Sequence, residues 1–133
     1  MGTASLSVAH YGHPLLKGAK HWSFLLDTSE GCAITYQLTG STNTYELKEP
    51  EEIEILKSQT YLGRVVVGTI DTAKQGQLLN LLKKVPITRG NLQWNCQNWI
   101  AEALQALKEN GFDVVTLNHK DLHTSLQAAK REN

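Results

Sequence analysis

Apolar side chains follow one period in the first half of the chain and another in the second half. Up to about Asp71 they alternate with polar residues and include many β-branched types, a pattern typical of strands. Beyond Asp71 they recur at spacings of three and four residues, which is the period of a helix. Strands are predicted over residues 21–27, 32–39, 44–49, 52–58 and 62–70, and residues 112–117 are also expected to be extended.

Three helices are predicted after these strands. The first follows a capping-box pattern at residues 72–75 and ends at Pro86. The second starts after Asn95, a favoured N-cap residue type, and stops at Gly111. The third starts near Asn118. Strands followed by helices predict an α+β fold, in which an antiparallel sheet of about five strands is packed by three helices.

Composition and charge narrow the possible functions. The 133 residues fit a single domain, residues 1–133. Lys and Arg together number 13, as do Asp and Glu, so the net charge is zero and no nucleic-acid partner is expected. No run approaches the ~20 apolar residues of a membrane-spanning helix, and the N-terminus lacks the pattern of an export signal. Cys32 and Cys96 are therefore expected to be free thiols of a cytoplasmic protein, and no residue pattern indicates a particular oligomeric state.

Cys96 is the first candidate for chemistry because of its position. It follows Asn95 at the predicted start of a helix. The positive end of the helix dipole and the free backbone N–H groups favour a thiolate there, and the thiolate is the nucleophilic form of cysteine. The same N–H groups can stabilise an oxyanion beside the sulfur. The alternative is that Cys96 is a small buried residue on the apolar stripe of the helix.

A cysteine nucleophile needs a base, and His21 is the best placed of the five histidines. It opens a predicted strand, so its side chain projects from a rigid scaffold. The alternative is a hydrogen-bonded strand histidine without a catalytic role. His10 and His13 are expected in a loop, whereas His119 and His123 are expected to be solvated on the last helix.

A third polar group usually orients the base. Residues 28–31 are rich in turn-forming types and predict a hairpin. A three-residue loop centred on Ser29 places His21 opposite Gln37, so both side chains point to one face and the Gln37 amide can accept a hydrogen bond from the imidazole. A slipped register would put Tyr36 in this place, and Gln37 would then be only a polar strand residue.

The order of these residues resembles a known superfamily. His21-Trp22 opens a strand, a polar residue follows one strand later, and Asn95-Cys96 begins a helix. This order resembles the circularly permuted branch of the NlpC-type, papain-like cysteine hydrolases, and within it the lecithin retinol acyltransferase-like group. It is more similar still to a group of small fungal proteins whose helix starts with an Asn-Cys-Gln-Asp-Trp-like motif. The resemblance covers about residues 6–112 and implies a permuted papain-like fold, with the histidine strand before the cysteine helix.

The resemblance implies a role for each candidate residue. Cys96 would be the nucleophile and His21 the general base, and Gln37 would occupy an orienting position that commonly holds histidine in these families. A neutral amide fixes the imidazole tautomer but stabilises an imidazolium less than a charged partner does. Backbone N–H groups at Cys96, together with the Tyr11 hydroxyl, would hold the oxyanion. Trp22 and Asn95 are further expected contacts for the substrate or the oxyanion, although the tryptophans are expected to be core residues first.

These features predict a thiol-dependent hydrolase or acyltransferase that uses a Cys96–His21 dyad. Many acyltransferase-like relatives end in an apolar anchor, whereas this chain ends in a polar helix, so a soluble amide, ester or thioester is the expected substrate. One alternative is a peptidase or isopeptidase that acts on a protein tail. Another is a non-catalytic binding module on the same fold. No cofactor or metal is expected, because no Cys, His, Asp and Glu residues have ligand spacing.

Overall fold

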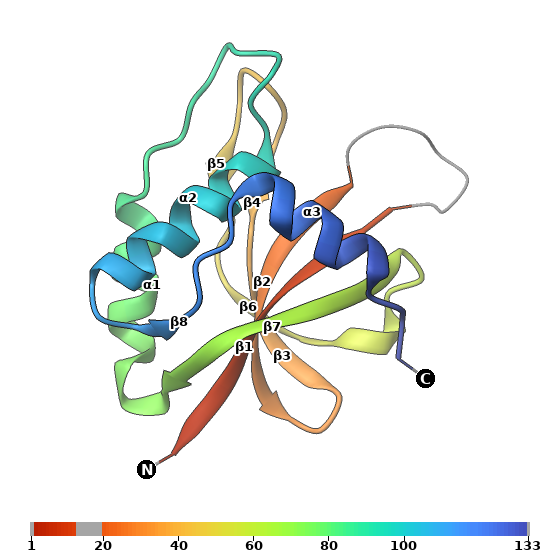
Figure 1. Cartoon of the computed structure of the whole chain (residues 1–133), viewed down its shortest axis with the longest axis vertical. Coiled ribbons are helices and arrows are strands. Elements are labelled where there is room, and N and C mark those ends of the chain that lie inside the picture. Colours follow the sequence, from red (N-terminus) through yellow and green to blue (C-terminus); the bar gives the residue numbers. More distant parts are fainter. Residues whose placement is uncertain (1, 13–19, 133) are drawn as a thin grey trace.

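The computed structural model describes residues 2–12 and 20–132 and contains a strongly curled antiparallel sheet (Figure 1). The sheet has six strands in the order β6-β3-β2-β1-β7-β8. Their bounds are β1 Thr3–Tyr11, β2 His21–Ser29, β3 Cys32–Tyr36, β6 Glu51–Glu54, β7 Tyr61–Asp71 and β8 Asp113–Val114. A separate two-stranded sheet pairs β4 Leu38–Thr39 with β5 Glu46–Leu47.

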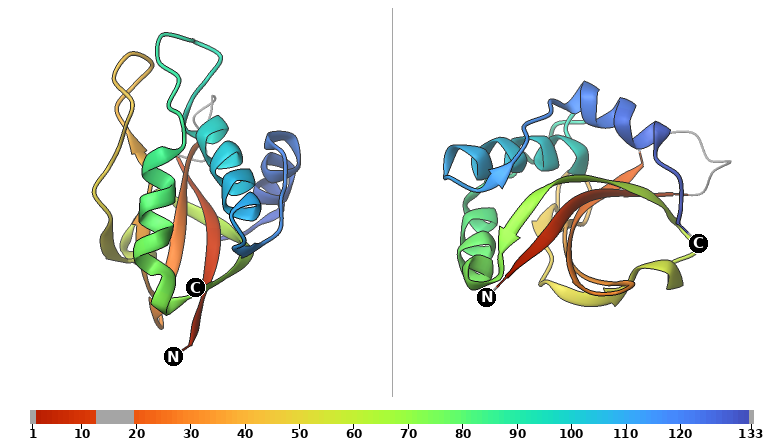
Figure 2. Two further views of the ribbon diagram at one scale, coloured as in Figure 1. Left: turned by 90° about the vertical axis from the view of Figure 1, so that its left-hand side faces the viewer. Right: turned by 60° about the horizontal axis from the view of Figure 1, so that its bottom comes forward.

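Three α-helices cover the outer side of the curled sheet (Figure 2). They are α1 Gln75–Lys84, α2 Cys96–Glu109 and α3 His119–Ala128. Short 3₁₀ helices, η1 Ile55–Lys57 and η2 Thr72–Lys74, join strands to the elements that follow them. The predicted α+β class is confirmed, with six strands in the main sheet rather than about five. Among the described residues, no helix has the length and apolar character needed to cross a membrane.

The strand boundaries differ from the sequence prediction in the first half of the chain. β1 is a full central strand that pairs with both β2 and β7, although no strand was predicted before residue 21. The predicted strand 32–39 divides at Gln37, and its second part joins β5 outside the main sheet. The predicted strand 52–58 ends early because residues 55–57 form η1. Alternation of apolar residues thus located several extended segments, but it did not locate β1 or predict which strands pair with one another.

The predicted capping box at residues 72–75 does not form. Asp71 instead caps η2, because its carboxylate accepts a hydrogen bond from the backbone N–H of Ala73 at 2.9 Å. Helix α1 then starts at Gln75 without a side-chain cap. Asp71, an acidic residue one position before the predicted cap Thr72, is therefore the residue that caps this turn.

The two faces of the sheet are packed differently. The outer face carries Trp22 and Phe24, which are buried against α2, and the ring of Phe24 meets the edge of Trp99 at 6.1 Å. The inner face carries a smaller buried cluster, whose members are Ala9, Leu25, Ala33, Ile55 and Tyr61. Because strand side chains alternate, His21 shares the inner face with Leu25. The first residue of β2 is therefore a polar residue on the inner face of the sheet.

The C-terminal segment after α3 crosses β7 and is held there by several contacts. A Cβ atom at Gly63 would lie only 3.1 Å from the backbone of Lys130, and Gly63 has a φ of +141°, so this crossing requires glycine. The Arg131 guanidinium donates hydrogen bonds to the backbone carbonyls of Leu56, Ser58 and Tyr61. The segment thus braces the loop between η1 and β7.

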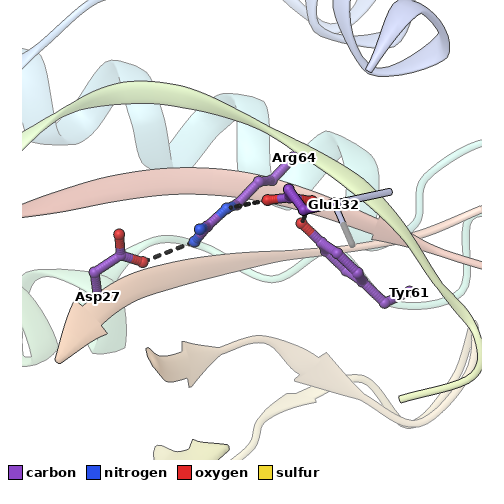
Figure 3. A network of polar contacts seen from close by, with 4 residues as sticks. All are labelled: Asp27, Tyr61, Arg64 and Glu132. Carbon is purple, nitrogen blue, oxygen red and sulfur yellow. Dashed lines mark hydrogen bonds and ion pairs between the residues drawn. The ribbon is translucent and has the colours of Figure 1, made fainter. Parts of the chain in front are cut away.

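A polar network joins this segment to the sheet (Figure 3). Arg64 on β7 donates to Asp27 on β2 at 2.7 Å and to Glu132 at 2.9 Å. The Tyr61 hydroxyl donates to the second oxygen of Glu132 at 2.7 Å. Partial burial alone would raise the pKa of Glu132, but the hydrogen bonds from Tyr61 and Arg64 outweigh it and leave this pKa below its ordinary value.

We expect Glu132 to make the stability of the protein depend on acidity. A carboxyl group whose pKa is lower in the folded chain stabilises the fold above its unfolded pKa of ~4.3, and this stabilisation is lost as the pH falls through the folded pKa. The variant Glu132→Gln should therefore show a smaller loss of unfolding free energy between about pH 5 and pH 3. Urea unfolding at several pH values measures this slope. The exposed Glu109→Gln serves as the control, and an unchanged slope in Glu132→Gln would contradict the assignment.

Candidate active site

Cys96 is the first residue of α2, and the helix start is fixed by its neighbours. The side chain of Asn95 accepts a hydrogen bond from the backbone N–H of Gln97 at 2.9 Å. The side chain of Asn98 accepts one from the backbone N–H of Asn95 at 3.0 Å. This capping box confirms Asn95 as the N-cap residue. The Cys96 thiol is half-buried and unpaired with Cys32, at the positive end of the helix dipole.

The structure brings His21 and Gln37 into contact, as the hairpin predicted. The Nε2 atom of His21 lies 2.6 Å from the Oε1 atom of Gln37. The register differs from the prediction, because Leu26 pairs with Ile34 and a two-residue turn at Glu30-Gly31 closes the hairpin. His21 and Gln37 consequently meet diagonally.

His21 and Gln37 are still in contact because the observed register differs from the predicted one by two residues. A shift of two keeps both side chains on the same face of the sheet, whereas a shift of one would have separated them. Tyr36, the alternative partner, is buried on the outer face with Phe24. Gln37, rather than Tyr36, is therefore the residue that contacts His21.

The contact with Gln37 sets the tautomer of His21. An amide oxygen accepts hydrogen bonds only, so Nε2 of His21 carries the hydrogen in this contact. The other ring nitrogen, Nδ1, is then available to accept a hydrogen bond from the Cys96 thiol, which acts on the pKa of the imidazole. His21 thus lies between an orienting acceptor and a proton donor, the arrangement that a general base requires.

The two partners shift each other's pKa in opposite directions. Burial alone would raise the pKa of the Cys96 thiol, but hydrogen bonds from His21 and from the backbone N–H of Trp22 outweigh burial, so this pKa is lowered. Burial alone would lower the pKa of His21, but the hydrogen bond and charge of Cys96, together with the hydrogen bond to Gln37, raise it. Both shifts favour a thiolate–imidazolium pair.

The remaining predicted site residues have different surroundings. The Tyr11 side chain lies on the inner face beside His21, with ring centroids 6.1 Å apart. Burial raises the pKa of Tyr11, and the nearby Arg64 charge only partly offsets this, so its hydroxyl stays protonated. The indole of Trp22 is buried on the outer face, and its backbone N–H is the group that reaches Cys96.

A cavity of about 700 Å³ opens on the inner face beside His21. Its walls come from the ends of β1 and β2, from β3 and β6, and from the loop after η1. The lining residues are Tyr11, Gly12, His21, Thr35, Gln37, Glu51, Ile53, Glu54, Lys57, Ser58 and Thr60. Cys96 is not among these lining residues, so the cavity reaches the candidate pair through His21. The volume is within the range of small-molecule sites.

Two nearby residues were missed by the sequence reasoning. The positive charge of Lys48 lowers the pKa of His21, but this effect is smaller than those of Cys96 and Gln37, which raise it. Burial raises the pKa of Tyr45, and the negative charge of Cys96 adds to this. The ring of Tyr45 also meets Trp94 edge-on at 5.8 Å. Both residues come from the segment around β5, whose position outside the main sheet has no signal in the apolar pattern.

The other described histidines, His10, His119 and His123, have surroundings of their own away from the candidate pair. His10 is in strand β1 rather than in a loop, and it is buried, which lowers its pKa. His119 and His123 are exposed, but both rings contact the indole of Trp22. His13 lies outside the described residues. Within residues 2–12 and 20–132, no three Cys, His, Asp or Glu side chains are grouped so that they could hold a metal ion.

We expect the Gln37 contact to determine how well His21 works as a base. The variant Gln37→Leu removes the acceptor and frees the imidazole, so iodoacetamide should alkylate Cys96 about 10-fold more slowly at neutral pH. Gln37→Glu keeps an acceptor and adds a charge that favours the imidazolium, so alkylation should stay fast. Gln77→Leu on the exposed side of α1 is the matched control. Equal rates for Gln37→Leu and the control would contradict an orienting role.

The fold and the site define this chain as an α+β domain in which the strand that begins with His21 precedes the helix that begins with Cys96. The chain belongs to the DUF6914 family, a family of unknown function, whose model matches residues 6–131. Neither the curated proteins nor the solved structures contain a match to this sequence.

Proposed function

We propose that this protein is a thiol-dependent hydrolase or acyltransferase, with Cys96 as the nucleophile and His21 as the base. The observation that carries the proposal is the position of the His21 imidazole, which contacts Gln37 at 2.6 Å and is close enough to the Cys96 thiol for the two groups to shift each other's pKa. Nucleophile, base and orienting group in this order are the minimum that acyl transfer through a cysteine needs. The order of the histidine strand and the cysteine helix along the chain also supports a permuted papain-like relationship.

The reaction would begin with proton transfer from the Cys96 thiol to Nδ1 of His21. The thiolate attacks a carbonyl carbon, an S–C bond forms, and the carbonyl electron pair moves to oxygen. When the intermediate collapses, the bond to the leaving group breaks and the imidazolium returns its proton to that group. Water or an amine then attacks the carbonyl carbon of the thioester, and His21 removes a proton from this attacking molecule. The S–C bond breaks, the acyl group leaves, and Cys96 returns to its starting state.

Backbone N–H groups would stabilise the oxyanion. Those of Cys96 and Trp22 lie beside the sulfur, and both lower the pKa of the thiol. They belong to rigid elements, α2 and β2, so little reorganisation accompanies the reaction. The protonated hydroxyl of Tyr11 is the additional donor on the inner face.

The substrate class follows from the cavity and its lining. We propose a soluble amide, ester or thioester, with one part of the molecule in the space between His21 and β6. The walls combine hydroxyl-bearing residues with the charged side chains of Glu51, Glu54 and Lys57, which suits a small polar molecule or a short peptide. Two half-buried free thiols fit the reducing conditions of the cytoplasm, which we propose as its location.

Trapping the acyl-enzyme tests the proposal. A panel of p-nitrophenyl esters and acyl thioesters is incubated with the protein, and the mass of each cysteine-containing peptide is measured. We expect the mass of one acyl group on Cys96, its removal by water or by added hydroxylamine, and no adduct on Cys32. Cys96→Ser and Cys32→Ser are the matched variants. If no compound of the panel acylates Cys96, or if Cys96 is acylated no faster than Cys32, the result would support the non-catalytic binding module instead.

A further inference from the structure

Gln97, the residue after the nucleophile, is held at both ends of its side chain. It is only 4% exposed, which is unusual for glutamine. Its Nε2 atom donates to the backbone carbonyl of Lys20 at 2.8 Å. Its Oε1 atom lies 2.8 Å from Nε2 of His119 on α3. A buried amide is costly without partners, and here both of its polar atoms are paired.

These contacts determine the direction of every hydrogen bond. The Lys20 carbonyl only accepts, so the amide nitrogen of Gln97 must face it and the amide oxygen must face His119. His119 must then carry its hydrogen on Nε2. The His119 ring also stacks on the indole of Trp22, with centroids 5.3 Å apart and planes 24° apart. Four groups from three separate segments thus hold one another.

The position of this cluster relates it to the reacting atoms. Gln97 directly follows Cys96, and Lys20 directly precedes His21. The hydrogen bond between Gln97 and Lys20 therefore ties the first turn of α2 to the first residues of β2. A hydrogen bond between the thiol and the imidazole weakens steeply as its length and angle change. The hydrogen bond between Gln97 and Lys20 involves the sequence neighbours of Cys96 and His21, so it limits changes in the distance and angle between these two side chains.

We propose that Gln97 and His119 are positioning residues that hold Cys96 at hydrogen-bonding distance from His21, with α3 serving as the brace. This inference rests on the proposed thiol chemistry of the Cys96–His21 pair. Neither residue touches the reacting atoms. Gln97 sets the separation through the Lys20 carbonyl, and His119 fixes the amide orientation that makes this contact possible.

The test measures the pKa of Cys96 from the pH dependence of iodoacetamide alkylation, in a Cys32→Ser background. Gln97→Met keeps the length of the side chain but loses both hydrogen bonds. We expect its Cys96 pKa to move toward the ordinary value of ~8.5 and alkylation at neutral pH to slow about 10-fold. His119→Phe keeps a ring on Trp22 but loses the hydrogen bond, and about a 3-fold slowing is expected. Gln105→Met, an exposed position of α2, is the matched control.

A melting curve for each variant separates positioning from a general loss of stability. A lower melting temperature with an unchanged Cys96 pKa would overturn the inference, because a merely structural role moves only the first quantity. If Gln97→Met fails to fold, His119→Phe decides by the same criterion. His21→Ala distinguishes the two proposals. A raised Cys96 pKa in His21→Ala but not in the Gln97 and His119 variants would overturn only the positioning role, whereas no change in His21→Ala would overturn the dyad itself.

Discussion

The variant His21→Ala should lower kcat for any accepted ester or thioester by about 10²- to 10⁴-fold, the usual contribution of a general base. Two effects combine in this loss. The thiol loses the hydrogen bond and the positive charge that lower its pKa, so less thiolate is present at neutral pH. The leaving group also loses its proton donor. Stopped-flow or steady-state hydrolysis of the ester that acylates Cys96 measures kcat directly.

The control for this prediction is another histidine that is removed without touching Cys96. His123→Ala is suitable because its ring lies against Trp22 and His119 on the outer side of the sheet. We expect wild-type kcat in this variant. A His21→Ala protein that retains full kcat while folding normally would remove His21 from the reaction.

The variant Trp99→Ala should have the largest effect on stability, about 3–5 kcal/mol of unfolding free energy. Trp99 is fully buried between α2 and the outer face of the sheet, where it meets Phe24. Its removal opens a cavity under the first turn of the helix that begins at Cys96. A loss of this size is a large part of the stability of a typical domain, so Cys96 should also lose its protected environment.

Urea unfolding followed by circular dichroism measures this loss. Leu92→Ala is the matched control, because Leu92 is 90% exposed and its truncation should change stability by less than about 0.5 kcal/mol. A Trp99→Ala cost below about 1 kcal/mol would mean that α2 does not depend on this contact with the sheet.

Local signals in the sequence predicted the parts of the site that depend on near neighbours. Asn95 is a favoured cap type directly before Cys96, and the structure forms that cap. The contact between His21 and Gln37 followed from a short hairpin. It was predicted with a register two residues away from the observed one, and it formed because alternation keeps both side chains on one face.

Parts that depend on distant segments left no comparable signal. Gln97 lies next to the apolar stripe of its helix. The sequence around it does not indicate that Lys20 and His119 form hydrogen bonds with its side-chain amide. Tyr45 belongs to a predicted strand that lies outside the main sheet in the structure, where the Tyr45 side chain is near Cys96. Such contacts are decided by how separate elements pack together. Residue periodicity along one element does not contain that information.

The most direct test of the central claim is the pKa of the Cys96 thiol in the intact protein. It is read from the ultraviolet absorbance of the thiolate as a function of pH, as the difference between Cys32→Ser and the double variant Cys32→Ser/Cys96→Ser. A Cys96 that is paired with His21 should titrate clearly below the ordinary thiol value of ~8.5. Titration at or above that value would contradict the thiolate–imidazolium pair and, with it, the proposed acyl chemistry.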